Sequence, residues 1–210
     1  MVIGGLQKQS FIDWEGKTTA VIFTRGCNFR CGFCHNPSLV LPELYDRAEN
    51  ISPDDVLDFV AARKNWLDGV VITGGEPTLH KDLPDFIASL KKIGFPVKLD
   101  TNGSNPDMVQ SLLSHQLIDY VAMDIKTKFE PEAYAEITAC AESLLAERVV
   151  QSLCILRNSN IDYMLRTTLV PGFHTDEDIR MLREQFASER YVLQEYRAGE
   201  TVETYRSCKC

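Results

Sequence analysis

The segment AVIFTRGCNFRCGFCHNP, residues 20–37, joins a short apolar run to three closely spaced cysteines. The run at residues 21–23 has the composition of a buried strand. Cys27, Cys31 and Cys34 follow as soon as this run ends. The same order, an apolar strand followed at once by glycines or chemically active side chains, recurs along the chain and predicts the fold.

Five more strand-like stretches follow and alternate with amphipathic helical patterns. They lie within GVVITGGEP (69–77), PVKLDTNG (96–103), DYVAMDIK (119–126), YMLRTTLVPG (163–172) and YVLQEY (191–196). Helices are expected after Ser52, over residues 83–90 and 108–113, over 131–157 with a break near Arg148, and over 179–186. Six strand–helix units with short connections predict an α/β fold with a parallel sheet. The pattern leaves an open doubly wound sheet and a partial barrel as alternatives.

The expected strands end in residues suited to binding chemistry. After the cysteines come Gly74-Gly75-Glu76, Asp100-Thr101-Asn102, Asp124 with Lys126, and Pro171-Gly172. Ligands of parallel α/β proteins bind at the carboxyl ends of the strands, which meet at one edge of the sheet. We therefore expect these groups to form a single site.

Length and charge narrow the class of protein. The 210 residues can bury the core of one domain, which we expect over residues 1–197. Residues 198–210 lack periodicity and are expected to form a C-terminal tail. The net charge of −8 is unsuited to binding the phosphate backbone, so nucleic acid is not an expected partner.

The sequence also predicts a cellular compartment. No run of 18 apolar residues is present, and the first residues, MVIGGLQKQS, lack the features of a signal peptide. A cytoplasmic protein without a membrane partner is therefore expected. We expect Cys140 and Cys154 to be small buried residues on helices, and Cys208 and Cys210 to be exposed thiols of the tail. A redox relay or a metal shared with a partner is the alternative for the last two.

Three cysteines at this spacing leave several interpretations open. A disulfide with one spare thiol is disfavoured in a reducing cytoplasm. Cys27, Cys31 and Cys34 with His35 would make a zinc set, although adjacent residues ligate one ion with difficulty. Alternatively, the three thiolates hold a [4Fe–4S] cluster, because soft sulfur ligands suit iron–sulfur centres. One iron of that cluster would stay open to a small molecule.

The loop CNFRCGFC resembles the cluster loop of radical S-adenosylmethionine (SAM) enzymes. GCNFRCGFCHNP, ITGGEPTL, DTNG, MDIK and LVPG occur in the order typical of that superfamily, within residues 10–175. CHNP and the upstream SFIDWEGK resemble the branch that activates glycyl radical enzymes. Within that branch the chain is most similar to activating proteins of anaerobic ribonucleoside-triphosphate reductase, and next to pyruvate formate-lyase activating enzymes. Glu15 departs from the branch, which commonly has proline before the glycine that corresponds to Gly16.

The resemblance implies a fold, a reaction and partners. The fold would be a partial (β/α)6 TIM-like barrel of parallel strands with outer helices. The reaction would be reductive cleavage of SAM to a 5′-deoxyadenosyl radical, which takes hydrogen from a glycine Cα of a glycyl radical enzyme. A reduced flavodoxin or ferredoxin would supply the electron. No general base is expected, because a hydrogen atom rather than a proton is transferred.

The resemblance also assigns roles to the residues of the cysteine loop, which follows the first strand. Cys27, Cys31 and Cys34 would ligate three irons, and SAM would bind the fourth through its amino and carboxylate groups. Phe33 would lie near the adenine, or else be an aromatic residue of the core. His35 would lie near SAM or cap local structure.

Roles at the later strand ends follow in the same way. Gly74, Gly75 and Glu76 would form the loop that binds the methionine part of SAM, with Glu76 either accepting from its amino group or bracing the loop. Asp100 and Asn102 would bind ribose or the amine, although TNG is also a simple turn. Asp124 and Lys126 would bind ribose hydroxyls and the SAM carboxylate, or form a surface ion pair. Val170 would pack on the adenine.

Two other functions remain as alternatives. A non-catalytic iron–sulfur module for electron transfer would not need GGEP, DTNG and MDIK at successive strand ends. A radical SAM enzyme acting on a small molecule or a tRNA base would need further residues to hold that substrate. The sequence therefore favours an activating enzyme with a protein substrate.

Overall fold

Six strands run parallel and follow one another across a single sheet in chain order. The computed structural model describes residues 1–206, whose strands are β1 (Ile3–Ser10), β2 (Thr19–Thr24), β3 (Gly69–Gly74), β4 (Val97–Thr101), β5 (Tyr120–Asp124), β6 (Asp162–Leu169) and β7 (Tyr191–Glu195). The spatial order is β1 to β7, with β1 antiparallel to β2 and every later pair parallel. The curved sheet confirms the predicted α/β partial barrel.

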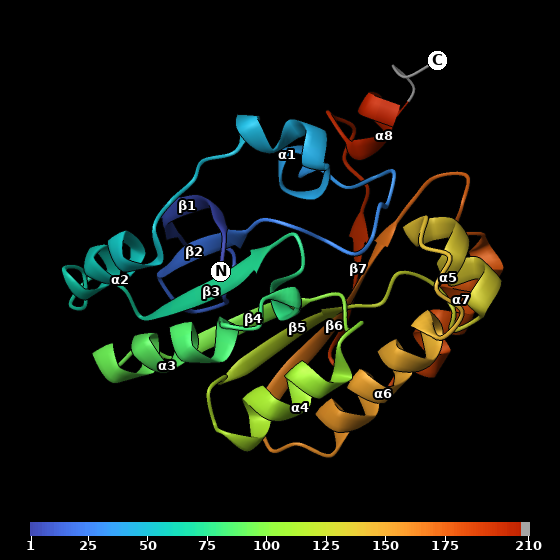
Figure 1. Cartoon of the computed structure of the whole chain (residues 1–210). Helices are drawn as coiled ribbons and strands as arrows, with labels where there is room; N and C mark the ends of the chain where they lie inside the picture. Colours follow the sequence, from blue (N-terminus) through green and yellow to red (C-terminus); the bar gives the residue numbers. More distant parts are fainter. Residues whose placement is uncertain (207–210) are drawn as a thin grey trace.

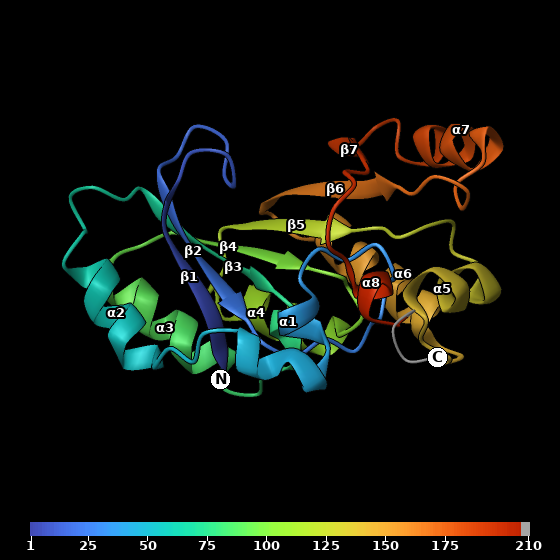
Figure 2. The same cartoon turned by 90° about the horizontal axis from the view of Figure 1, so that it is seen from above.

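Eight helices accompany the sheet in the described residues. They are α1 (Pro37–Val40), α2 (Pro53–Ala61), α3 (Leu83–Ile93), α4 (Pro106–Ser114), α5 (Pro131–Thr138), α6 (Leu145–Arg157), α7 (Asp176–Gln185) and α8 (Val202–Arg206), with 3-10 turns at Pro42–Arg47 and Pro77–Leu79. In Figures 1 and 2, α2, α3, α4 and α6 lie along the outer side of the sheet. Within residues 1–206, no helix has the length and apolar character needed to cross a membrane.

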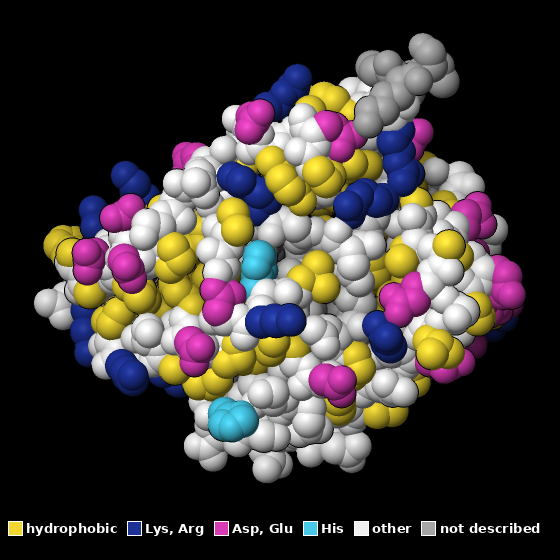
Figure 3. All heavy atoms as spheres, in the orientation of Figure 1, with side chains coloured by type: hydrophobic (Ala, Val, Ile, Leu, Met, Phe, Trp, Pro, Cys, Tyr) yellow, Lys and Arg dark blue, Asp and Glu magenta, His cyan; other side chains and the backbone are white. Residues whose placement is uncertain are grey.

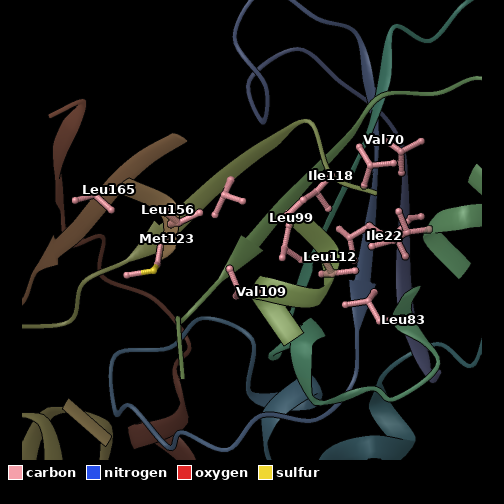
Figure 4. Close-up of a cluster of buried hydrophobic side chains, with 14 of the residues drawn as sticks. Ile22, Val70, Leu83, Leu99, Val109, Leu112, Ile118, Met123, Leu156 and Leu165 are labelled. Carbon is pink, nitrogen blue, oxygen red and sulfur yellow. The ribbon is translucent and has the colours of Figure 1, made fainter. Parts of the chain in front are cut away.

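The two faces of the sheet carry different side chains because neighbouring residues of a strand point to opposite sides. Val70 and Ile72 of β3 belong to the main core, together with residues of the outer helices such as Leu83 and Leu112. Figure 4 shows this layer between strands and helices. Val71, between the first two, belongs instead to a small cluster with Trp14, Val21 and Tyr120. The inner face of the barrel is thus partly apolar.

Strand β1 has no clear signal in the sequence. Its sequence, IGGLQKQS, has two glycines and an exposed polar run, Gln7 to Gln9, so it lacks an apolar period. The strand forms because it pairs with the edge of β2. On its other side an isolated bridge joins Ile3 to Ile51, and the charge of Lys8 suits the exposed edge beyond that bridge.

Three other expectations were wrong. The break in the 131–157 helix comes at residues 139–144, where Ala139 adopts a left-handed conformation, and Arg148 lies inside α6. Cys154 is exposed on α6, and Cys140 is half-buried just after α5. The expected irregular tail contains α8, whose Val202 is fully buried. Cys208 and Cys210 lie outside the described residues.

Candidate active site

A cavity of about 250 Å³ opens at the carboxyl ends of the parallel strands. Every predicted site residue except Val170 lines it, namely Cys27, Cys31, Phe33, Cys34, His35, Gly74, Gly75, Glu76, Asp100, Asn102, Asp124 and Lys126. Residues that were not predicted for the site also contribute to the wall, among them Phe29, Arg166 and Thr168. Segments more than 100 residues apart in sequence therefore meet at one place.

Backbone hydrogen bonds hold the first part of the cysteine loop to its surroundings. Gly26 N–H donates to the carbonyl of Leu39 at 2.7 Å, and Arg30 N–H donates to that of Thr138 at 2.7 Å. Within the loop, Cys34 N–H donates to the carbonyl of Cys31 at 3.1 Å. The loop thus enters the cavity wall between β2 and α1 in a defined conformation.

The three thiols lie in an environment that disfavours their charge. Burial raises the pKa of Cys27 to about 12 and that of Cys31 to about 11, and it also raises the pKa of Cys34. A thiolate is the form that binds metals. These side chains therefore stay protonated until a cationic group offsets the burial of their negative charge.

The zinc alternative gains no support from the geometry. Zinc requires its ligand atoms about 2.0–2.3 Å from one ion. Among the side chains of residues 1–206, no three of His, Cys, Asp or Glu converge closely enough for that. The ring of His35 stacks on Tyr196 at 5.7 Å between centroids, and its Nε2 lies 2.7 Å from the carbonyl oxygen of Arg197. His35 therefore contacts the segment after β7 and also lines the cavity.

The two glycines after β3 permit a close approach between backbones. A Cβ on Gly75 would overlap the carbonyl of Gly26, and one on Gly74 would overlap the backbone of Thr24. Gly74 also has φ of +115°, which side chains other than glycine rarely adopt. The GGE turn is therefore packed directly against the cysteine loop.

Glu76 joins two strand-end loops from a fully buried position. Its Oε1 accepts from Thr78 N–H at 3.1 Å, Thr78 Oγ1 at 2.5 Å and Thr101 Oγ1 at 2.7 Å. Its Oε2 accepts from the N–H of Asn102 at 2.7 Å. Because protein donors surround both carboxylate oxygens, the geometry favours the bracing role over binding of the SAM amino group.

Glu76→Gln should lower the free energy of unfolding. Either orientation of the amide turns its NH₂ group toward a backbone N–H, of Thr78 or of Asn102, that then lacks an acceptor. We expect a loss of about 1–3 kcal/mol, the usual cost of an unsatisfied buried group. Urea denaturation would measure it, with Glu136→Gln on the exposed face of α5 as the control. Equal stabilities of the two variants would contradict the bracing role.

A chain of ion pairs crosses the inner face of the barrel. Lys98 Nζ lies 2.9 Å from Asp100, and Arg166 bridges Asp100 at 3.0 Å and Asp124 at 2.9 Å. Lys126 Nζ completes the chain at 3.0 Å from Asp124. A signal for Arg166 was present in the sequence, since it stands at an inward position within the apolar strand YMLRTTL.

The network fixes the charges of the cavity wall. Burial alone would raise the pKa of Asp124, but Arg166 and Lys126 outweigh it and hold that pKa at about 2. Burial likewise opposes the charge of Lys126, but Asp124 raises the pKa of this lysine above its usual value. Lys126 Nζ lies 5.9 Å from the centre of the Phe33 ring. Asp124 and Lys126 are thus a pair inside the cavity rather than on the surface.

Val170 lies outside the cavity and has a different environment from the one expected. Its backbone N–H donates to Nδ1 of His174 at 2.9 Å, and Nε2 of that histidine lies 2.9 Å from the carbonyl oxygen of Lys126. His174, to which no role was given, therefore ties the loop after β6 to the segment after β5.

The family of the chain follows from comparison with known proteins. The sequence pattern of the Radical SAM superfamily matches residues 21–186. This chain belongs to the radical SAM superfamily. Membership implies an iron–sulfur cluster and SAM as cofactors.

Relatives within the superfamily show which of its branches this chain resembles. The radical SAM chain is 36% identical over 200 residues to a Methanocaldococcus jannaschii protein designated as a candidate glycyl-radical enzyme activating enzyme, covering 93% of this chain and 80% of the relative. It is 29% identical over 175 residues to the pyruvate formate-lyase-activating enzyme of Listeria monocytogenes, covering 78% and 67%. These relatives confirm the resemblance to the activating branch.

Solved structures agree on the fold. SuiB of Streptococcus suis bound to S-adenosylmethionine superposes with a TM-score of 0.62 at 16% identity, covering 85% of this chain and 42% of that protein. TYW1 with a lysine-pyruvate adduct gives a TM-score of 0.61 at 19% identity, covering 86% and 65%. The chain thus spans less than two thirds of either protein, and both share its radical SAM fold.

Proposed function

We propose that Cys27, Cys31 and Cys34 hold a [4Fe–4S] cluster in this cavity and leave one iron open to SAM. The observation that carries the proposal is the meeting of the cysteine loop with side chains from four further strand ends around one cavity. The donor set suits the group, because three thiols that line one cavity can each bind a separate iron. When bound, the cluster supplies the electron that cleaves SAM to methionine and a 5′-deoxyadenosyl radical.

The remaining side chains bind and orient SAM. Lys126, kept charged by Asp124, offers an ammonium group for the SAM carboxylate. Asp100 and Asn102 provide polar atoms for ribose or the amine, and Phe33 offers an aromatic surface for the adenine. Gly74 and Gly75 keep the wall beside the methionine part free of side chains. The protein thereby places the sulfonium next to the cysteine loop.

The charges of the site suit transfer of a hydrogen atom. A general base would need a carboxylate with a pKa near the working pH and an open acceptor. Asp124 has a pKa of about 2 and is paired with two cations, and both oxygens of Glu76 accept from protein groups. Asp124 is therefore not suited to removing a proton from a substrate. Burial raises the pKa of Glu76, but protein donors occupy both of its oxygens.

The proposed substrate is a glycine Cα–H of a glycyl radical enzyme. The resemblance to activating proteins of anaerobic ribonucleoside-triphosphate reductase makes that reductase the proposed partner. The designated activity of the Methanocaldococcus relative supports the glycyl radical class. Pyruvate formate-lyase is the alternative partner, supported by the Listeria relative. A reduced flavodoxin or ferredoxin in the cytoplasm would provide the electron.

Anaerobic reconstitution with iron and sulfide tests this proposal. After reduction with dithionite, addition of SAM should change the EPR spectrum of the cluster and produce 5′-deoxyadenosine. Incubation with a candidate glycyl radical enzyme should then give a glycyl radical signal. A fully iron-loaded protein that neither responds to SAM nor cleaves it would contradict the enzyme proposal and favour an electron carrier.

A further inference from the structure

The two halves of the cysteine loop are held by different parts of the molecule. The first half is tied to the barrel through Gly26 and Arg30, and Asn28 also contacts Ser104 and Asn102 at 2.9 and 3.0 Å. Within residues 1–206, the backbone hydrogen bonds that join residues 32–34 to another element come from the C-terminal segment. Val202 N–H donates to the carbonyl of Cys34, and Glu203 N–H to that of Gly32, both at 2.9 Å.

Side chains fasten the same segment, residues 196–206, which we call the C-terminal clasp. At its start, Tyr196 stacks on His35. Near its end, Val202 is fully buried in a cluster with Val40, Leu41 and Leu44, and this cluster packs against Cys27 and Cys34. Arg47 donates to the hydroxyl of Tyr205 at 2.7 Å, with its guanidinium 5.2 Å from the ring centre.

The path of the clasp gives it a place in the barrel. The sheet is open, with β1 and β7 as its two edges. Figures 1 and 2 show the chain leaving β7 and crossing to α8, which lies beside α1. In Figure 3, apolar side chains gather over this region, flanked by Lys and Arg. The clasp therefore links the last strand to the loop after the first parallel strand, across the open side of the barrel.

We propose that the clasp is the positioning element for Cys34 and His35. Its two N–H groups fix the carbonyls on either side of Phe33, and Val202 supplies part of the apolar surface behind Cys27 and Cys34. The first half of the loop keeps its own anchors whether or not the clasp is docked. That the clasp orients a cluster ligand rests on the proposed function. That the clasp holds the cysteine loop in place is independent of it.

Val202→Asp tests the clasp, because a buried carboxylate among apolar side chains should undock it. In the protein without cofactors, hydrogen exchange should quicken at the amides of Val202, Glu203 and Cys34. Val202 and Glu203 each lose one backbone hydrogen bond worth roughly a factor of five, so we expect their exchange to accelerate by about 25-fold. The amides of Gly26 and Arg30 should keep the exchange rates of the unaltered protein.

Controls separate a local effect from general unfolding. Val202→Ile keeps the apolar contact and should exchange like the unaltered protein, as should Leu144→Asp, the same kind of change at an exposed position. Tyr205→Ala is a milder variant that removes the contact with Arg47, and it should also speed exchange at these amides. It replaces Val202→Asp in the test if that variant does not fold. Undisturbed exchange at Cys34 in a variant whose Val202 and Glu203 amides have opened would overturn the proposal.

A spectroscopic measurement addresses the cofactor. After reconstitution and reduction, Val202→Asp should give an EPR spectrum with a weaker response to SAM, and Val202→Ile should restore the response. A normal response from a protein with an undocked clasp would overturn a role in orienting the ligand. If the unaltered protein binds no cluster, the proposed function fails, and the exchange measurement still decides whether the clasp holds the loop.

Discussion

Cys31→Ala is expected to abolish formation of 5′-deoxyadenosine. Cys31 is the middle cysteine of the loop, is buried, and lines the cavity with Cys27 and Cys34. Without it, two thiols remain to hold the proposed cluster. Loss of residues that merely support metal ligands costs about 10–100-fold in affinity or activity, so loss of a ligand itself should exceed about 100-fold.

The measurement is deoxyadenosine released per protein under dithionite, together with bound iron and sulfide. Cys154→Ala is the matched control, because Cys154 is exposed on α6 and away from the cavity lining. It should retain full iron content and full activity. Cleavage of SAM by Cys31→Ala at the rate of the control would remove Cys31 from the proposed ligand set.

Arg166→Met should destabilise the folded protein by about 3 kcal/mol. Arg166 makes charge-assisted hydrogen bonds to Asp100 and Asp124, and its side chain is 18% exposed. Each carboxylate keeps one lysine partner, Lys98 or Lys126, but loses a bond of about 1.5–3 kcal/mol. Removing one partner of a buried ion pair typically costs about 3–5 kcal/mol, in agreement with this magnitude.

Urea denaturation of the protein without cofactors would measure the loss. Arg180→Met is the control, because Arg180 pairs with Glu177 and Glu184 on the exposed face of α7. Such surface pairs contribute little, so the control should unfold near the midpoint of the unaltered protein. Similar midpoints for Arg166→Met and the control would show that the network does not stabilise the fold.

The pH dependence of this loss follows from Asp124. Its pKa is about 2 in the folded protein, below the usual 3.8. Because the folded-state pKa is the lower one, the carboxylate stabilises the protein above about pH 4, and this contribution disappears as the pH falls toward about 2. The stability difference between Arg166→Met and the unaltered protein should therefore be smaller at about pH 3 than at about pH 5. A constant difference would exclude Asp124 as its source.

The amino-acid sequence by itself determined the parallel α/β architecture and the edge of the sheet that carries the site. Apolar strands alternate with amphipathic helices, and both patterns can be recognised because they depend only on residues close together in the sequence. Parallel strands place their carboxyl ends together, so GGE, DTN and Asp124 with Lys126 could be assigned to the cavity of the cysteines without coordinates. Strand β1 was not predicted, because it forms by pairing with β2 and its sequence has no apolar period.

Only the tertiary structure decided how these side chains are used. It surrounds Glu76 with protein donors, adds Arg166 as the bridge between Asp100 and Asp124, and leaves Val170 outside the cavity. It also brings α8 to the cysteine loop, although more than 160 residues separate Val202 from Cys34. Hydrogen bonds and ion pairs between distant segments depend on distances of about 3 Å that no local pattern encodes. The kinds of functional residue at the strand ends can therefore be predicted from the sequence. Which of them bind a ligand, brace a loop or position another residue depends on the tertiary packing.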